Sequence, residues 1–245
     1  LYSCYSALKA FIHMFIRLVT DTLGAENVEG IYLHGSLATG SYYMPKSDMD
    51  MLAVVKDKLE PDTAKKLNKQ IALLDDTRPT AGSIEFSIIT ADTAKRIPIP
   101  MPYELHYSAA WHDRILGDAV IYGAEQYDTD LQAHLFCLTG RGICVFGKPI
   151  NRIFGQVKWE DFLYAVLDDL DWILADEHIV ESPYYGILNI CRVFQLLVEK
   201  EPYPYSKDEG GLCGLQYFPV PYTPLITAAL EVYHDKSSSS ICGRI

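Results

Sequence analysis

The sequence has little positive charge for its length. Its 245 residues include 21 lysines and arginines against 32 aspartates and glutamates, which gives a net charge of −11 and a pI of about 5.0. Proteins that bind the phosphate backbone of nucleic acids usually carry basic surfaces, so this balance argues against DNA or RNA as the main partner. It suits a cationic small molecule, although many proteins are acidic for solubility alone.

The sequence also lacks a cysteine framework and a membrane-spanning run. The six cysteines show no spacing typical of a metal site or of a disulfide-stapled domain, so we expect free thiols and a cytoplasmic protein. The apolar stretch 8–19 contains His13 and Arg17 and is too short to cross a bilayer. We expect a monomer without a membrane partner. The serine run and the residues after it, 237–245, look like a frayed or altered terminus.

The chain is organised around residues 28–55. Ile31–His34 has the apolar composition of a short buried strand, and Asp50–Val55 has that of a second strand. The residues between them include glycine, serine and proline, which suit a short helix and a turn but not a third strand. The stretch therefore predicts two strands with polar residues near their ends.

Asp48 and Asp50 stand at the start of the second strand. Residues two apart in a strand point to the same face, so the two carboxylates should project side by side. Adjacent carboxylates repel unless a cation lies between them, and Mg²⁺ takes oxygen ligands while keeping waters and substrate phosphates in its shell. Gly35 would let the backbone approach a phosphate, and Ser36 would add a hydroxyl near a helix start. The plainer alternative is a Gly-Ser turn and two solvated aspartates.

These residues resemble a known signature. Gly35-Ser36, then eleven residues, then Asp48-x-Asp50 within apolar flanks is similar to the motif of the DNA-polymerase-β-like nucleotidyltransferase superfamily. The resemblance implies that Asp48 and Asp50 bind Mg²⁺ and take part in catalysis. It also implies that Gly35, Ser36 and Ser47 belong to the nucleotide-binding core.

Glu85 is the informative member of a third predicted strand, Ser83–Thr90. Ile84, Phe86 and Ile88 share one face of this strand, and Glu85 lies on the opposite face. A charged residue in so apolar a strand needs a partner or a cation. The alternative is a half-exposed edge strand.

The remaining pattern divides the chain into two parts. We expect an α/β nucleotidyltransferase domain with a mixed sheet over residues 1–155, and an all-α helical bundle over residues 156–245. The glycine- and proline-containing segment 147–157 marks the boundary. In the first part, the spacing predicts helices over 3–23, 61–74, 103–116 and 132–139, and a strand over 142–146. In the second part, it predicts helices over 159–175, 183–199, 206–217 and 222–234.

With both parts considered, the chain resembles the aminoglycoside adenylyltransferases of the spectinomycin/streptomycin type over nearly its whole length. The resemblance implies that Glu85 is the catalytic base and that Trp111 lies beside the antibiotic. It implies that Arg192, Lys207 and Tyr233 hold ATP from the second domain. Each has a structural alternative: Lys207 could belong to a surface helix start, Arg192 to an internal ion pair, and Tyr233 or Trp111 to a core.

The chain departs from the family pattern at several places, among them a segment from Val193 to Ser206 that is slightly longer than in the resistance enzymes. Relatives that accept streptomycin carry an aspartate about where Ser182 stands, and Glu181 is offset from it by one residue. We assign both residues to the substrate site and expect spectinomycin to be favoured over streptomycin. The segment Glu209-Gly210-Gly211 replaces the helix-forming residues that usually follow the lysine.

The expected reaction is ATP- and Mg²⁺-dependent adenylyl transfer to a hydroxyl of an aminoglycoside or aminocyclitol antibiotic, with release of pyrophosphate. Two alternatives stay open. A toxin-like nucleotidyltransferase would modify a protein or RNA, but the acidic charge and the helical-domain resemblance weigh against it. An inactive nucleotide-binding module is disfavoured by the intact Asp48, Asp50 and Glu85.

Overall fold

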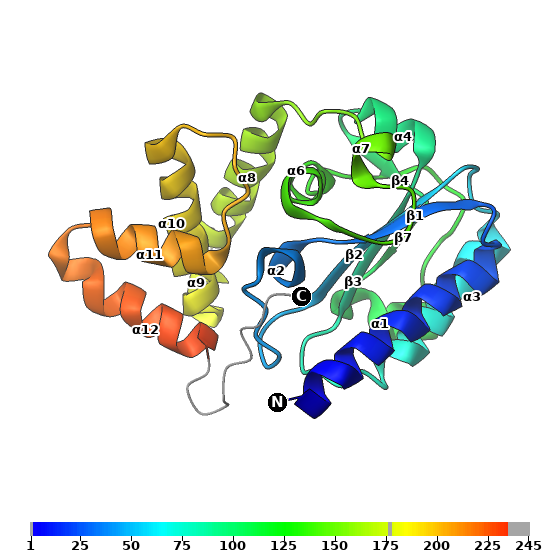
Figure 1. Cartoon of the computed structure of the whole chain (residues 1–245), viewed down its shortest axis with the longest axis horizontal. Helices are drawn as coiled ribbons and strands as arrows, with labels where there is room; N and C mark the ends of the chain where they lie inside the picture. The colour runs from blue at the N-terminus through cyan, green and yellow to red at the C-terminus, as the bar shows by residue number, and fades with distance from the viewer. Residues whose placement is uncertain (1, 176–177, 235–245) are drawn as a thin grey trace.

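The computed structural model of the protein describes residues 2–175 and 178–234, so the expectation for residues 237–245 lies outside the described residues. Figure 1 shows an α/β part beside a part made of helices, which confirms the expected fold class. No helix in the described ranges has the length and apolar character needed to cross a membrane. The helical part contains α8 (Trp159–Leu174), α9 (His178–Glu181), α10 (Pro183–Glu199), α11 (Lys207–Tyr217), the 3₁₀ turn η2 (Val220–Tyr222) and α12 (Thr223–His234).

The α/β part is built on a mixed sheet with the strand order β5-β3-β2-β1-β7. Its strands are β1 (Val28–Leu33), β2 (Met49–Val55), β3 (Ile84–Thr90), β5 (Leu105–Tyr107) and β7 (Ile143–Gly147). β2 and β3 are parallel, and the other neighbouring pairs are antiparallel. The strands predicted from the sequence are therefore confirmed, with boundaries shifted by a few residues. A separate two-stranded sheet pairs β4 (Met101–Tyr103) with β6 (Gln126–Asp128).

Helices cover both faces of the sheet (Figure 1). α1 (Tyr2–Leu23) and α3 (Pro61–Asp75) lie on one face, where Phe15 meets Phe86 edge to face with ring centroids 4.8 Å apart. On the other face Tyr32 packs against Phe154 at 5.0 Å. That face is covered by α4 (Ala91–Arg96), α6 (Leu131–Arg141) and α7 (Ile150–Ile153). Glu85 points to the α6 side because it alternates with Phe86 along β3.

The helix predicted over 103–116 is wrong. The segment contains the end of β4, then β5, the 3₁₀ turn η1 (Ala109–Trp111) and the short helix α5 (His112–Leu116). Leu105 and Tyr107 are buried and pair with β3, where Tyr107 lies opposite Phe86. Pairing with the exposed edge of β3 satisfies backbone groups that a helix would have satisfied internally, so tertiary context overrides the local pattern.

The predicted helices of the second part are confirmed, and glycines let two of them pack closely. A Cβ added at Gly210 would lie 2.6 Å from Cγ of Arg192, and one at Gly211 would lie 2.6 Å from Cδ2 of Leu230. Ser206 caps α11 in a capping box with Glu209. The departure noted at 209–211 therefore allows α11 to approach α10 at Arg192 and α12 at Leu230.

The two parts share a core where α8 packs on α6. The rings of Phe136 and Phe162 stack with centroids 3.8 Å apart, and Leu196 belongs to the same apolar cluster as Leu135. The segment between α7 and α8 contains the expected boundary at residues 155 and 156. This boundary stays a prediction, because the apolar contacts continue across it.

Candidate active site

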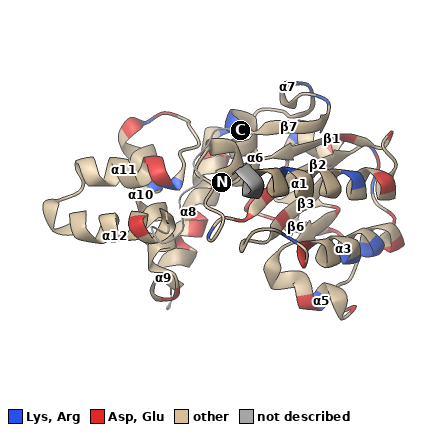
Figure 2. Ribbon diagram, turned by 60° about the horizontal axis from the view of Figure 1, so that its bottom comes forward, with Lys and Arg blue, Asp and Glu red and all other residues tan. Residues whose placement is uncertain are grey.

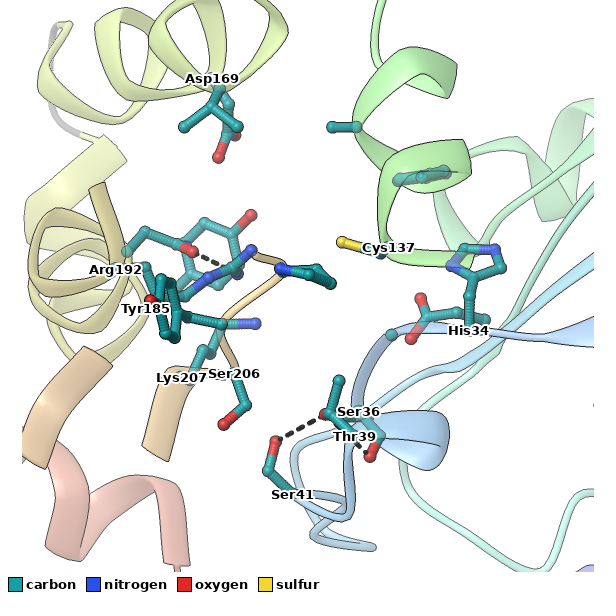
Figure 3. A pocket seen from close by; sticks show the side chains of 18 of the residues that line it. His34, Ser36, Thr39, Ser41, Cys137, Asp169, Tyr185, Arg192, Ser206 and Lys207 are labelled. Atoms are coloured by element: carbon teal, nitrogen blue, oxygen red, sulfur yellow. Dashed lines mark hydrogen bonds between the residues drawn. The ribbon is translucent and has the colours of Figure 1, made fainter. Parts of the chain in front are cut away.

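A polar cavity of about 330 Å³ lies between the two parts. Figure 3 shows Lys207, Arg192 and Tyr185 reaching into it from the helical side, with Ser36 and His34 on the opposite side. Most of the residues predicted from the sequence line this one cavity, namely Gly35, Ser36, Ser47, Asp48, Asp50, Glu85, Arg192, Lys207 and Tyr233.

The carboxylates come from the sheet. Asp50 lies directly opposite Glu85 in the parallel register of β2 and β3, and Asp48 immediately precedes β2. Burial, followed by the charge of Glu85, raises the pKa of Asp50 above its ordinary value. Burial also raises the pKa of Asp48, although its Oδ1 accepts a hydrogen bond from the Ser83 amide at 2.8 Å. The negative charge of these neighbouring carboxylates is therefore not balanced by the groups around them.

This charge fits a divalent cation. Within the described ranges, the Asp50 carboxylate has no hydrogen-bond donor, which is costly for a carboxylate that is partly buried. No group of three or more His, Cys, Asp or Glu side chains in these ranges is arranged as a complete metal site. Mg²⁺ usually takes only one or two carboxylates from a protein and completes its shell with waters and substrate phosphates. Asp48 and Asp50 match that requirement.

The Gly35-Ser36 segment approaches these carboxylates closely. Gly35 has φ +56°, and a Cβ there would lie 2.0 Å from Oδ2 of Asp50, so only glycine fits. Ser36 follows it in α2 (Gly35–Thr39), and its Oγ is buried without a hydrogen-bond partner among the described residues. An unpaired buried hydroxyl that lines a cavity is a donor available to a ligand oxygen.

Two cations come from the helical part. Arg192 of α10 donates to Oδ1 of Asn189 at 2.9 Å, and Nζ of Lys207 lies 4.8 Å from the ring centre of Tyr185. Burial, then the charge of Arg192, lowers the pKa of Lys207 to about 8, with Asp50 acting in the opposite direction. The basic residues of α3 lie at the far end of the α/β part in Figure 2. Arg192 and Lys207 line the cavity together with Lys46 of the loop before β2, so these three side chains can meet a polyanion there.

Tyr233 has a structural role beside the one that the resemblance implied. Its side chain is 2% exposed, and its hydroxyl donates to the Ser41 carbonyl at 2.7 Å and lies 3.4 Å from Ser47 Oγ. Ser47 Oγ also accepts a hydrogen bond from the amide of Tyr43. Tyr233 therefore joins α12 to the loop after α2, and its hydroxyl is already used. Tyr233 still lines the cavity, where Nζ of Lys207 lies 5.9 Å from the centre of its ring.

Three predicted substrate residues lie outside the cavity wall. Trp111 lines a much smaller pocket beside His106, whose ring centroid is 5.7 Å from its own. Glu181 is an exposed residue of α9, and Ser182 precedes the first turn of α10. The structure does not bring these three residues together with the carboxylates.

The sequence reasoning missed His134. Its Nε2 lies 3.9 Å from Oε1 of Glu85 and 3.7 Å from Oδ2 of Asp130, the residue just before α6. Burial works against protonation of His134, but the charges of Asp130, Glu85 and Asp50 outweigh burial and raise its pKa. The available signal was the four-residue spacing of Asp130 and His134 at the start of the helix predicted over 132–139.

Two further polar residues were missed or only weakly indicated. Asn189 holds Arg192 with its carbonyl oxygen, while its buried Nδ2 has no partner among the described residues. Asp169 of α8 lines the cavity opposite α6 (Figure 3), and burial raises the pKa of its carboxyl. It was one member of an acidic run that also includes residues 176 and 177, which lie outside the described ranges.

Comparisons with known proteins point to one family of enzymes. Residues 152–243 match the family model described as aminoglycoside adenylyltransferase, C-terminal domain. A spectinomycin 9-adenylyltransferase of Campylobacter jejuni is 22% identical over 219 residues, which cover 88% of this chain and 81% of the relative. The crystal structure of the spectinomycin adenyltransferase AAD(9) from Enterococcus faecialis with ATP and spectinomycin is similar with a TM-score of 0.74 and 20% identity. That match covers 90% of this chain and 89% of the other, and at this identity it establishes the fold.

Proposed function

We propose that the chain, whose residues 152–243 match the C-terminal domain of aminoglycoside adenylyltransferases, is a nucleotidyltransferase that transfers the adenylyl group of ATP to a hydroxyl of spectinomycin. The observation that carries the proposal is the cavity itself. It brings Asp48, Asp50 and Glu85 of the sheet to face Arg192 and Lys207 of the helical part. Carboxylates on one side and cations on the other match a metal–triphosphate held across a cleft.

Each half of the cavity would hold a different part of the nucleotide. Ser36 donates its unpaired hydroxyl to a phosphate oxygen, and Arg192 and Lys207 bind the charge of the triphosphate. Asp48 and Asp50 would hold Mg²⁺, which when bound neutralises charge on the phosphates. These contacts would hold the α-phosphate within reach of the acceptor hydroxyl and stabilise the negative charge of the leaving pyrophosphate.

Glu85 is assigned the role of general base. In this mechanism its carboxylate accepts the proton of the acceptor hydroxyl as the oxygen bonds to the α-phosphorus of ATP. The bond from that phosphorus to the bridging oxygen breaks, and pyrophosphate takes the electron pair. His134 stays beside Glu85 and Asp130 throughout, with its Nε2 3.9 Å from Oε1 of Glu85.

Two arguments favour spectinomycin as the acceptor: the relatives act on it, and its charge suits the cavity. Spectinomycin carries hydroxyls and cationic amines, which suit a cavity that is lined by Asp130 and Asp169 beyond the triphosphate residues. The preference for spectinomycin over streptomycin rests on the resemblance alone, because Glu181 and Ser182 lie outside the cavity wall.

Incubation with ATP, Mg²⁺ and a panel of aminoglycosides tests this proposal. We expect pyrophosphate release with spectinomycin, and a mass increase of the antibiotic that corresponds to one AMP. The matched variants are Glu85→Gln, which should lose the reaction, and Glu60→Gln at the exposed residue before α3, which should keep it. AMP found on a protein or RNA instead of on the antibiotic would refute the assigned substrate class.

A further inference from the structure

Arg141, the last residue of α6, contacts both parts of the molecule. Its Nη2 donates to the Thr39 carbonyl at 2.9 Å. Its Nη1 donates to Oε2 of Glu209 at 2.6 Å and to the Pro204 carbonyl at 3.3 Å. The side chain is only 17% exposed, and its guanidinium lies over the ring of Tyr203. One guanidinium therefore joins the end of α2 to the start of α11.

Both contacts lie on elements that carry nucleotide-site residues. Thr39 ends the five-residue helix α2, which begins with Gly35 and Ser36. Glu209 lies in the first turn of α11, which begins with Lys207, and the same Glu209 carboxylate accepts the Ser206 amide at 2.7 Å. The position of Glu209 is thus fixed from its own helix and from α6 at the same time.

A second link lies on the other side of Lys207. Asp208 accepts a hydrogen bond from the Tyr43 hydroxyl at 3.0 Å, and its other oxygen lies 2.6 Å from Nε2 of His234. The two residues that follow Lys207 are therefore both tied to the α/β part, one through Tyr43 and one through Arg141. Lys207 itself is left to point into the cavity (Figure 3).

We propose that Arg141 is a positioning residue for ATP: it sets the distance between Ser36 and Lys207, and so joins the two halves of the triphosphate site before the nucleotide arrives. This inference rests on the proposed function. Arg141 does not line the cavity, so it acts through Thr39 and Glu209 and not through contact with substrate. A planar guanidinium suits this role because its donors, on separate nitrogens in a rigid fork, hold a carboxylate and a carbonyl in a fixed geometry, whereas the donors of a lysine all come from one nitrogen at the end of a flexible stem.

The expected effect follows from population. In wild type, nearly all molecules would have both halves of the triphosphate site in place. If replacing Arg141 lowers that fraction to about a tenth, the apparent Kd for ATP rises about tenfold. Saturating ATP pulls the two halves back together, so kcat should stay within about threefold while KM for ATP rises with Kd. A residue needed only for folding would lower the active fraction and leave KM unchanged.

Calorimetry with ATP and Mg²⁺ on the full chain, together with steady-state kinetics, tests the proposal. Arg141→Gln should raise Kd and KM for ATP about tenfold or more, and Arg141→Lys should raise them several-fold. Arg152→Gln, the same change at an exposed residue of α7, should match the wild type. A folded Arg141→Gln variant whose ATP Kd and KM lie within twofold of wild type would overturn the proposal. If Arg141→Gln does not fold, the same criterion applies to Arg141→Lys.

Hydrogen exchange separates this inference from the proposed function. In Arg141→Gln, amides of 39–41 and 206–210 should exchange faster, while those of the central strands stay protected. This measurement needs no nucleotide. If the wild type binds no ATP, the proposed function fails, and the exchange pattern alone decides whether Arg141 joins the two parts. Unchanged exchange in both segments would show that it does not.

Discussion

Asp50 should lower the stability of the metal-free protein, and replacing it should therefore stabilise the fold while ending catalysis. The carboxylate lies opposite Glu85, close to Asp48, and lacks a hydrogen-bond donor among the described residues. Asp50→Asn removes the charge and keeps the volume. We expect this variant to unfold at a higher temperature than wild type without Mg²⁺ and to transfer no adenylyl group.

The magnitude follows from the pKa. Burial and then Glu85 raise the pKa of Asp50 from 3.8 to about 7. Each pKa unit is worth about 1.4 kcal/mol, so the charged form is disfavoured by about 4 kcal/mol in the folded state. Asp50 keeps partial contact with solvent, which screens the charge, so we take about half of this, or ~2 kcal/mol. For a chain of this length that corresponds to a rise of about 4–8 °C in Tm.

The pH dependence of this difference has a definite sign. Because the folded pKa of Asp50 lies above the unfolded value, both states hold the proton at pH values below about 4 and the variant gains little there. Between pH 4 and 7 the unfolded chain gives up its proton first, so wild-type stability falls as pH rises and the advantage of Asp50→Asn grows. The gain in Tm should be larger at pH 8 than at pH 5.

Thermal unfolding at these two pH values without Mg²⁺, beside pyrophosphate release with Mg²⁺ and ATP, measures both effects. Asp57→Asn, in the exposed loop after β2, is the control and should change neither. A lower Tm for Asp50→Asn at pH 8 would show that Asp50 is a structural residue. Retained turnover at saturating ATP and Mg²⁺ would show that it is not needed for the metal.

Three further predictions address the remaining roles. Glu85→Gln should keep ATP affinity, measured by calorimetry, and lose about a hundredfold or more in kcat, as expected for a general base; a collapse of ATP binding would show that Glu85 is not the base. Ser36→Ala removes an unpaired buried hydroxyl, so Tm should not fall, whereas ATP Kd should rise about ten- to a hundredfold. Because the pKa of Lys207 is lowered to about 8, ATP affinity should weaken as pH rises from 7 to 9. Lys207→Arg should remove that pH dependence, since an arginine stays charged; an unchanged slope would place the titrating group elsewhere.

The catalytic strands could be predicted from the sequence because local pattern and tertiary role agree there. The apolar runs around Asp50 and Glu85 specify buried strands, and period-two alternation puts both carboxylates on one face of the sheet. The segment 103–116 could not be predicted in the same way. Its helical composition competes with pairing to the edge of β3, and that edge exists only after the sheet has formed.

The candidate site was predictable on the sheet side and less so on the helical side. Arg192 and Lys207 were found because the resemblance pointed to them, and the structure places both at the cavity. Tyr233 lines it as well, yet its hydroxyl serves the contact with Ser41. Side-chain direction within a bundle depends on how its helices dock, which no local pattern contains. His134 was missed for the same reason, since only the packing of α6 on the sheet brings it to Glu85.

The segment 209–211 shows how an apparent loss of helix-forming residues can serve the site. Glycines within a helix cost roughly 1 kcal/mol each relative to alanine, so Gly210 and Gly211 weaken α11 when it is considered alone. In the folded chain, side chains at these positions would collide with Arg192 and Leu230 at 2.6 Å, so the glycines permit the approach of α11 to its neighbours. Glu209 then caps the first turn and binds Arg141. Packing and these contacts offset the stability that the glycines cost the helix. They also hold Lys207 beside Arg192, a position that it would not keep if α11 did not pack against α10.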